Sequence, residues 1–177
     1  YGPKLEFVLI DAIGREWQCG TLQMDFVLPE RLGATYIDKN GEKKNPVMLH
    51  RAILGSMERW LGILIEQYSG RFPLWLSPIH VFVCTITEKA NEYALGLIKE
   101  LENNEIRCNV DLRNEKIGYK IREHSENGCP IILIVGEKEK DSNTVAIRRL
   151  GSNKQDFRLF KDFLEGIKRE TKPPDLV

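Results

Sequence analysis

Histidine is scarce in this sequence, and the motifs that usually carry catalytic or metal chemistry are missing. The chain has three histidines and four cysteines in 177 residues, and no two cysteines are close enough to form a CxxC metal pair. There is no phosphate-binding Walker loop, no HExxH motif and no GxSxG motif. The sequence therefore gives no support for a P-loop nucleotide hydrolase, a zinc protease or a hydrolase with a Ser-His-Asp triad.

Net charge is lacking too. Lys and Arg together number 26, as do Asp and Glu, and the parts before and after Pro78 are each balanced. Any nucleic-acid site must therefore be a local patch. We find no signal peptide and no apolar run long enough to span a bilayer, and we expect a cytoplasmic protein with free cysteines and no membrane partner.

The composition is that of an ordinary soluble globular protein, with 42% hydrophobic and 29% charged residues. Its length allows one domain or two small ones. The first residues, Tyr1-Gly2-Pro3-Lys4, lack an initiator methionine and lead directly into a strand-like run. Such a start is typical of an internal part of a longer protein, so we expect further chain upstream.

The first part of the chain is predicted to form an antiparallel sheet followed by a helix. Gly20, inside the second strand, indicates a bulge or a close approach of a ligand. A period of three to four residues from Ser56 to Tyr68 predicts one amphipathic helix, which Gly70 ends. The expected strands are Leu5–Asp11, Glu16–Leu28 and Pro46–Ile53.

Two prolines, Pro73 and Pro78, predict a linker at 71–78, and we place the domains at 1–75 and 76–177. The second domain is expected to have the order βαβαββα with a mixed sheet, so the fold class is α+β followed by α/β. Its expected strands are 79–86, 105–112, 130–135 and 144–150. Its expected helices are 87–103, 118–125 and a last one that carries Phe157, Phe160, Phe163, Leu164 and Ile167.

Polar residues in the first part leave two interpretations open. Gln18 and Gln23 in the second strand suit either a half-solvated sheet or the floor of a substrate pocket. His50 alone is more typical of a structural histidine than of a zinc ligand, because zinc needs three or four protein ligands. Ser56 and Arg59 are either a helix cap with a solvated arginine or an anion site at a helix start.

A basic stretch from Arg113 to Arg122 combines four cations with Asn114 and Tyr119. Such runs are usually solvated surfaces, but an aromatic and an amide among cations also suit a loop of single-stranded RNA. Glu139 and Arg148 flank the following pair of strands and could complete that surface.

Four segments in order, "YGPKLEF", "WQCGTLQMDFVLPERL", "PVMLHRAILGSMERW" and "DLRNEKIGYKIREH", resemble threonyl-tRNA synthetase, a class II aminoacyl-tRNA synthetase of bacterial type. The resemblance runs nearly end to end. It implies the C-terminal part of the catalytic core, including the third class II motif, followed by the anticodon-binding domain.

The resemblance also implies roles for individual residues. His50 is similar to the third ligand of the family's zinc, whose other two ligands, a Cys and a His, would lie upstream. Arg59 is similar to the arginine that stacks on adenine, and Lys4 to the lysine near the adenylate phosphate. The other implied residues are Gln18 and Ser56 for ATP, Tyr1 and Gln23 for threonine, Asn114, Glu139 and Arg148 for anticodon bases, and Lys116, Lys120 and Arg122 for the tRNA backbone.

The implied reaction joins threonine to ATP, with magnesium, to give threonyl-adenylate, and then transfers the threonyl group to tRNA(Thr). The first two class II motifs and an editing domain are absent, so we expect this chain alone to be inactive. The family's homodimer is expected to form through regions that this chain lacks. The alternative is a non-catalytic, synthetase-like accessory protein that binds tRNA, although the presence of Lys4, His50 and Arg59 favours the enzyme.

Overall fold

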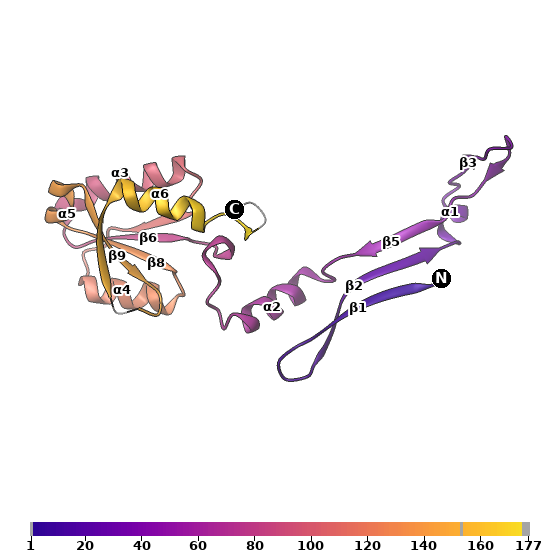
Figure 1. Ribbon diagram of the computed structural model, residues 1–177, viewed down its shortest axis with the longest axis horizontal. Coiled ribbons are helices and arrows are strands. Elements are labelled where there is room, and N and C mark those ends of the chain that lie inside the picture. Colours follow the sequence, from indigo (N-terminus) through magenta and orange to yellow (C-terminus); the bar gives the residue numbers. More distant parts are fainter. Residues whose placement is uncertain (1, 153, 175–177) are drawn as a thin grey trace. The chain divides into compact units, whose positions relative to one another are not determined.

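The computed structural model describes residues 2–152 and 154–174, which form two compact units, Tyr1–Gln67 and Tyr68–Val177 (Figure 1). No helix in these residues is long and apolar enough to cross a membrane. The expected fold class, an antiparallel sheet with a helix followed by a mixed α/β unit, is confirmed. The boundary between the two units falls between Gln67 and Tyr68, whereas the sequence predicts a domain boundary after residue 75.

The first unit is a three-stranded antiparallel sheet in the order β1-β2-β5. Asp38 lies in the turn of a small hairpin, where its side chain accepts hydrogen bonds from the backbone N–H groups of Asn40 and Glu42 at 2.8 and 3.0 Å. The elements are β1 (Lys4–Ile10), β2 (Glu16–Asp25), α1 (Leu28–Arg31), β3 (Tyr36–Ile37), β4 (Lys43–Lys44), β5 (Met48–Ala52) and α2 (Met57–Gln67).

The sheet of the first unit has one mostly polar and one mostly apolar face, because side chains alternate along each strand. Phe7, Leu9, Leu22 and Leu49 share the apolar face and, with Trp60, line a hollow of about 750 Å³. Phe7 is 64% exposed, and α2 buries none of its residues. The first unit therefore has little core of its own.

The second unit has a five-stranded sheet in the order β10-β9-β8-β6-β7, in which β6, β7 and β8 are parallel and β9 and β10 antiparallel. Helices α3 and α6 lie on one side of the sheet, and α4 lies on the other (Figure 1). The elements are η1 (Leu74–Leu76), β6 (Val81–Thr85), η2 (Glu88–Ala90), α3 (Asn91–Asn103), β7 (Cys108–Asp111), α4 (Ile117–Glu126), β8 (Ile131–Val135), α5 (Glu137–Ser142), β9 (Thr144–Arg149), β10 (Gln155–Leu159) and α6 (Phe160–Glu170).

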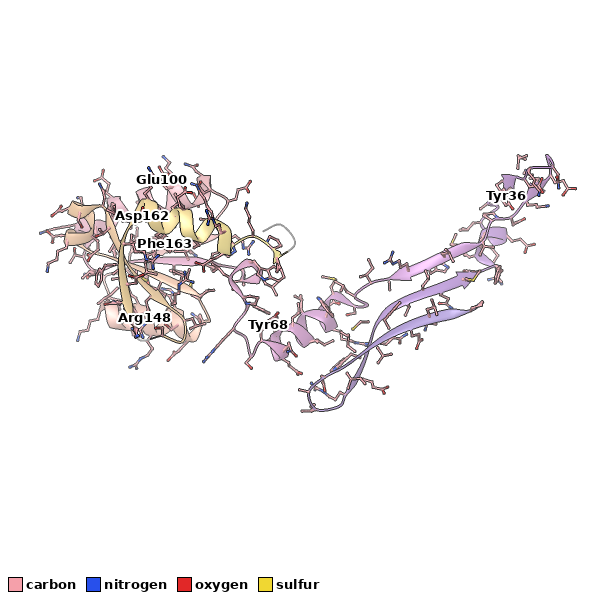
Figure 2. All side chains as sticks on the ribbon, in the orientation of Figure 1. Tyr36, Tyr68, Glu100, Arg148, Asp162 and Phe163 are labelled. Carbon is pink, nitrogen blue, oxygen red and sulfur yellow. The ribbon has the colours of Figure 1, made fainter. Side chains whose placement is uncertain are left out.

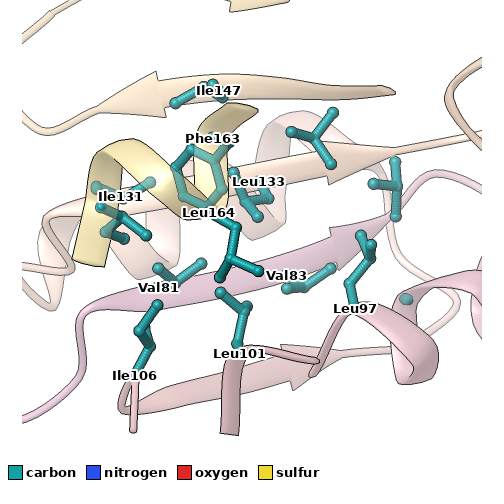
Figure 3. Close-up of a cluster of buried hydrophobic side chains, with 14 of the residues drawn as sticks. Val81, Val83, Leu97, Leu101, Ile106, Ile131, Leu133, Ile147, Phe163 and Leu164 are labelled. Atoms are coloured by element: carbon teal, nitrogen blue, oxygen red, sulfur yellow. The ribbon is translucent and has the colours of Figure 1, made fainter. Parts of the chain in front are cut away.

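The core of the second unit lies between the sheet and the pair α3 and α6 (Figure 3). Val83 and Leu133, on the two central strands, are 0% exposed, and Leu101 and Phe163 from the helices pack with them. A smaller cluster around Ile132 and Ile134 lies on the α4 side. Because both sides are covered, β6 and β8 are the nearly continuous apolar runs that the sequence shows.

Two elements differ from the expected order of the second unit. A short helix, α5, lies between β8 and β9, where the sequence predicts no helix, and a fifth strand, β10, precedes the last helix. The prediction that Phe157 belongs to that helix is wrong, since it lies in β10 and only Phe160, Phe163, Leu164 and Ile167 are helical. Phe157 lies three residues before Phe160, so helical spacing alone included it.

His80, directly before β6, forms a side-chain hydrogen bond to the segment directly before β7. Its ring is 1% exposed, and its Nδ1 accepts the backbone N–H of Arg107 at 3.2 Å. The proton of the neutral ring must therefore lie on Nε2, which has no hydrogen-bond partner among the described residues. Burial, and then the charge of Arg107, lowers the pKa of His80 to about 4.

We expect His80 to make folding sensitive to acid. Below pH 6.5 the unfolded chain protonates this histidine while the folded chain does not, so stability falls as the pH drops toward 4. His80→Gln keeps an acceptor for Arg107 but does not titrate. Between pH 7 and pH 4, denaturant unfolding should show the parent losing about 3 kcal/mol more stability than the variant. Parallel losses in both proteins would contradict this role.

Candidate functional site

Three of the predicted site residues of the first unit lie in one row across its sheet. Lys4 on β1 pairs with Gln23 on β2, and Gln23 pairs with His50 on β5. Residues directly opposite each other in an antiparallel pair point to the same face, with Cβ atoms about 5 Å apart. The row therefore places an ammonium, an amide and an imidazole side by side on the polar face.

A bulge brings Gln18 to the same face. Phe7 pairs with Gly20 but Val8 pairs with Gln18, so Cys19 is the extra residue of β2 and Gly20 marks a bulge as predicted. Without this extra residue, Gln18 would point to the apolar face. Instead its Nε2 donates to Glu6 Oε1 at 2.9 Å, and Glu6 also pairs with Lys4.

Asp25 orients His50, and the sequence analysis missed it. His50 Nε2 lies 2.9 Å from Asp25 Oδ2, while Oδ1 accepts the backbone N–H groups of Val27 and Leu28, each at 2.9 Å. The Leu28 N–H, followed by His50, lowers the pKa of Asp25 to about 2. With Nε2 donating to this carboxylate, Nδ1 is left as the ring nitrogen with a free lone pair. An acidic residue at a strand end, facing a polar row, is the signal that could have identified Asp25.

Ser56 and Arg59 begin α2 beside the bulge. The Ser56 hydroxyl accepts the Arg59 backbone N–H at 3.3 Å and donates to Glu58 at 2.7 Å, so Ser56 caps the helix. Gly55 has a φ of 70°, and a Cβ there would be 3.1 Å from the Cys19 carbonyl oxygen. This close approach holds the helix start against the strand that carries Gln18. Tyr1, the remaining predicted residue of the first unit, lies outside the described residues.

In the second unit, two predicted residues follow β7 and β8, the parallel strands on either side of β6. Asn114 is exposed in the loop after β7, and Glu139 lies in α5, directly after β8. Both loops leave the carboxyl ends of parallel strands, the usual place for a ligand in such sheets. One oxygen of Glu139 accepts the Gly136 backbone N–H at 2.9 Å, which fixes the side chain at the helix start.

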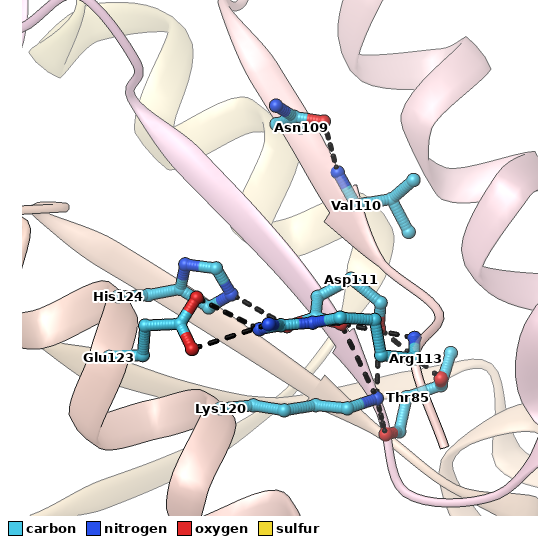
Figure 4. A network of polar contacts seen from close by, with 8 residues as sticks. All are labelled: Thr85, Asn109, Val110, Asp111, Arg113, Lys120, Glu123 and His124. Atoms are coloured by element: carbon cyan, nitrogen blue, oxygen red, sulfur yellow. Dashed lines mark hydrogen bonds and ion pairs between the residues drawn. The ribbon is translucent and has the colours of Figure 1, made fainter. Parts of the chain in front are cut away.

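A buried charge network holds the loop of Asn114 (Figure 4). Asp111 is 4% exposed and binds Arg113 at 2.6 Å and His124 at 2.8 Å through Oδ2. Arg113 also reaches Glu123 on α4 at 3.0 Å. Burial alone would raise the pKa of Asp111, but hydrogen bonds from Arg113 and His124 outweigh it and lower the pKa. Asp111 and Arg113, which precede Asn114, are thereby tied to α4.

Lys120 does not lie on the surface, so its predicted contact with a tRNA backbone is not supported. It is 1% exposed, and its Nζ donates to the carbonyl oxygens of Thr85 at 2.9 Å and Asp111 at 3.1 Å. Asp111 Oδ1 lies 3.7 Å from the same ammonium. The prediction came from the family resemblance and from the basic stretch Arg113 to Arg122, whereas position 120 faces inward on α4. Lys116 and Arg122, the neighbouring predictions, are exposed.

Arg122 and Arg148 line a polar groove of about 760 Å³ beside α4, and Figure 2 labels Arg148 on this side of the sheet. Arg71, which the sequence analysis did not single out, is a third cation of the groove. Glu126 is the acidic residue among the groove's lining. The groove can therefore take an anion such as a phosphate.

Two family models match the chain. The "Anticodon binding domain" matches residues 80–170, more than half of the chain, and the "tRNA synthetase class II core domain (G, H, P, S and T)" matches residues 1–68. The chain is 57% identical to the threonine--tRNA ligase of a Caulobacter species over all 177 residues, and 57% identical to that of Rickettsia bellii over 170 residues. The chain belongs to the threonyl-tRNA synthetase family.

A solved structure agrees with this family. The RNA binding domain of threonyl-tRNA synthetase from Cryptosporidium parvum Iowa II has a TM-score of 0.85 and 35% identity, over 100% of this chain and 45% of that chain. The chain spans 27% of the length of the curated family members named above. The family thus accounts for both units of the fold.

One group of three side chains in the described part of the chain has the residue types of a metal site. Cys84, Asp111 and His124 have ligand atoms within 4.8 Å of one another. Both oxygens of Asp111 are already engaged by cations, and burial raises the pKa of Cys84 to about 12. This chemistry suits a structural network rather than a metal centre, which needs a thiolate and free carboxylate oxygens.

We expect Lys120→Met to destabilise the second unit by about 2–4 kcal/mol, because it leaves two buried carbonyl groups and part of the Asp111 charge unsatisfied. Lys116→Met, four residues earlier and exposed, is the matched control and should change stability by less than about 0.5 kcal/mol. Denaturant unfolding followed by circular dichroism measures both. Equal, small effects would show that the buried ammonium contributes little.

Proposed function

We propose that this chain is part of an enzyme that activates threonine with ATP and transfers it to tRNA(Thr). The observation that carries the proposal is the row of Lys4, Gln23 and His50 on one polar face, which the bulge extends to Gln18. Four side chains from three strands converge there, next to a helix start that can bind anions. The family's members support the reaction class.

Within this proposal, the first unit supplies part of the activation site. Lys4 and Arg59 neutralise the phosphate charge of ATP with its magnesium, and Ser56 and Gln18 hold the nucleotide. Gln23 and Tyr1 are the residues proposed to bind threonine. These groups act by placement and by fixed positive charge, which a reaction at a phosphate requires.

His50 fits the role of a zinc ligand. Metal-binding histidines usually donate the second ring N–H to a carboxylate, and His50 has this arrangement with Asp25. The two other protein ligands would come from chain upstream of Tyr1. When bound, zinc would hold the amino and hydroxyl groups of threonine, and valine, which lacks the hydroxyl, would be rejected.

We expect no threonine-dependent ATP–pyrophosphate exchange from this chain alone, because Lys4, Gln18, Gln23 and His50 form only one side of the proposed site. The assay compares the purified chain with full-length threonine--tRNA ligase of the Caulobacter species as a positive control. Exchange by the chain above the background without threonine would show that its own residues are sufficient.

The second unit is proposed to bind the anticodon loop of tRNA(Thr), with the synthetase acting in the cytoplasm and as a homodimer through other regions. Asn114 and Glu139 follow the carboxyl ends of parallel strands, where ligands of such sheets usually bind, and Arg148 lines the groove beside α4. Amide, carboxylate and guanidinium groups suit the edges of unpaired bases, while Lys116 and Arg122 suit the backbone.

We expect the chain to bind a tRNA(Thr) anticodon stem-loop weakly and less tightly at higher salt. Arg148→Ala and Asn114→Ala should each weaken binding by about tenfold and reduce discrimination against an unrelated anticodon loop. Lys116→Ala should lower affinity for both loops alike and reduce the salt slope by about 0.7. Fluorescence anisotropy measures these effects.

Lys99→Ala is the control, because Lys99 is exposed on α3, on the opposite side of the sheet. It should leave binding unchanged. Equal affinity of the parent chain for both loops, at every salt concentration, would count against base recognition by Asn114, Glu139 and Arg148.

A further inference from the structure

Phe157 is the aromatic residue of β10 and is exposed. Its side chain is 62% exposed, although the sequence pattern places it among core residues of the last helix. The neighbouring phenylalanines behave differently, since Phe163 is 4% exposed and Phe160 is partly buried against the core. A large apolar ring that faces solvent in a regular strand is free to contact a ligand instead of the core.

Strand register places Phe157 on the same side of the sheet as α4. Phe157 pairs with Ala146, which pairs with Ile134, and these two residues belong to the buried cluster on the α4 side. The alternate residues of β9, Val145 and Ile147, face the core beneath α3 and α6. The ring therefore extends from the α4 side of the sheet.

The same register places Phe157 next to the cationic groove. Arg148 pairs with Gln155, which lies two residues before Phe157. Arg148 and Phe157 are therefore diagonal neighbours on one face of the sheet, and the Cα atoms of such neighbours are about 7–8 Å apart. Arg148 lines the groove with Arg71 and Arg122. An exposed aromatic ring can stack on a flat ligand, and the neighbouring guanidinium groups can bind an anion.

A single-stranded nucleotide has the matching pair of groups, a flat base and a phosphate. Bases of single-stranded RNA stack on exposed aromatic side chains in sheets, and the phosphates lie in positively charged grooves. Double-helical RNA offers no free base to such a ring. The charge of the groove and the exposed ring together therefore favour an unpaired nucleotide.

We propose that Phe157 stacks on an unpaired base of the anticodon loop while the groove of Arg71, Arg122 and Arg148 binds the loop's backbone. This inference rests on the proposed RNA-binding function and adds two residues, Phe157 and Arg71, that the sequence analysis did not assign to the site. Phe157 contributes affinity through its ring, and the three arginines contribute the salt dependence.

The test is binding of the full chain to a tRNA(Thr) anticodon stem-loop. Phe157→Ala should weaken binding by about 5- to 100-fold and leave the salt slope unchanged, because stacking neutralises no phosphate. Phe157→Tyr, which keeps the ring, should bind like the parent. Arg71→Ala should weaken binding and reduce the salt slope by about 0.7.

Leu95→Ala is the matched control, because Leu95 is an exposed apolar residue on α3, on the other side of the sheet, and is 50% exposed. It should not change binding. Phe157→Trp provides a spectroscopic signal, since its added fluorescence should be quenched by the stem-loop, whereas that of Leu95→Trp should not.

Two outcomes separate this inference from the function on which it rests. If Phe157→Ala binds like the parent and the Phe157→Trp signal is unaffected while Arg148→Ala weakens binding, the stacking role is wrong and the RNA-binding function stands. If the parent chain binds no stem-loop even at low salt, the RNA-binding function is wrong, and the stacking role is wrong with it.

Discussion

The buried carboxylate of Asp111 is the interaction on which the second unit's loops depend. Two acidic and two basic side chains, Asp111 and Glu123 with Arg113 and Lys120, cancel in charge at the place where β7 ends and α4 packs on the sheet. A buried charge is tolerated only when it is paired and hydrogen-bonded. The network meets that condition and, because Arg113 precedes Asn114, it also fixes the start of the exposed loop.

Lys120 shows how one buried group of the network can hold several elements together. One ammonium joins the last carbonyl groups of β6 and β7 to α4, so the carboxyl ends of two parallel strands are held by a helix that lies across them. His124 on the next turn binds the same carboxylate and stacks on Phe82 of β6, with ring centroids 3.7 Å apart. The surface loops can therefore be short and polar, since buried contacts determine their positions.

Sequence patterns predicted the parts of the fold that depend on local periodicity. The apolar runs of β6 and β8, the bulge at Gly20 and the helix α2 follow from alternation, from glycine and from helical spacing. Lys120 and Phe157 were misjudged for opposite reasons. A charged residue is buried because three elements meet around it, and an apolar residue is exposed because β10 is an added strand at the sheet edge. Neither the burial of Lys120 nor the exposure of Phe157 can be predicted from the residues next to it in the sequence.

The two units align their site residues by different means. In the second unit, buried charges and a packed core position exposed side chains, so the arrangement is part of that unit's own stability. In the first unit, Lys4, Gln23 and His50 are aligned by strand register, and Gln18 joins them through one extra residue. Backbone hydrogen bonds preserve such a row without a core, but they leave the opposite face, with Phe7 and Leu49, exposed to water. An apolar face of that kind is typical of a sheet that packs against further protein.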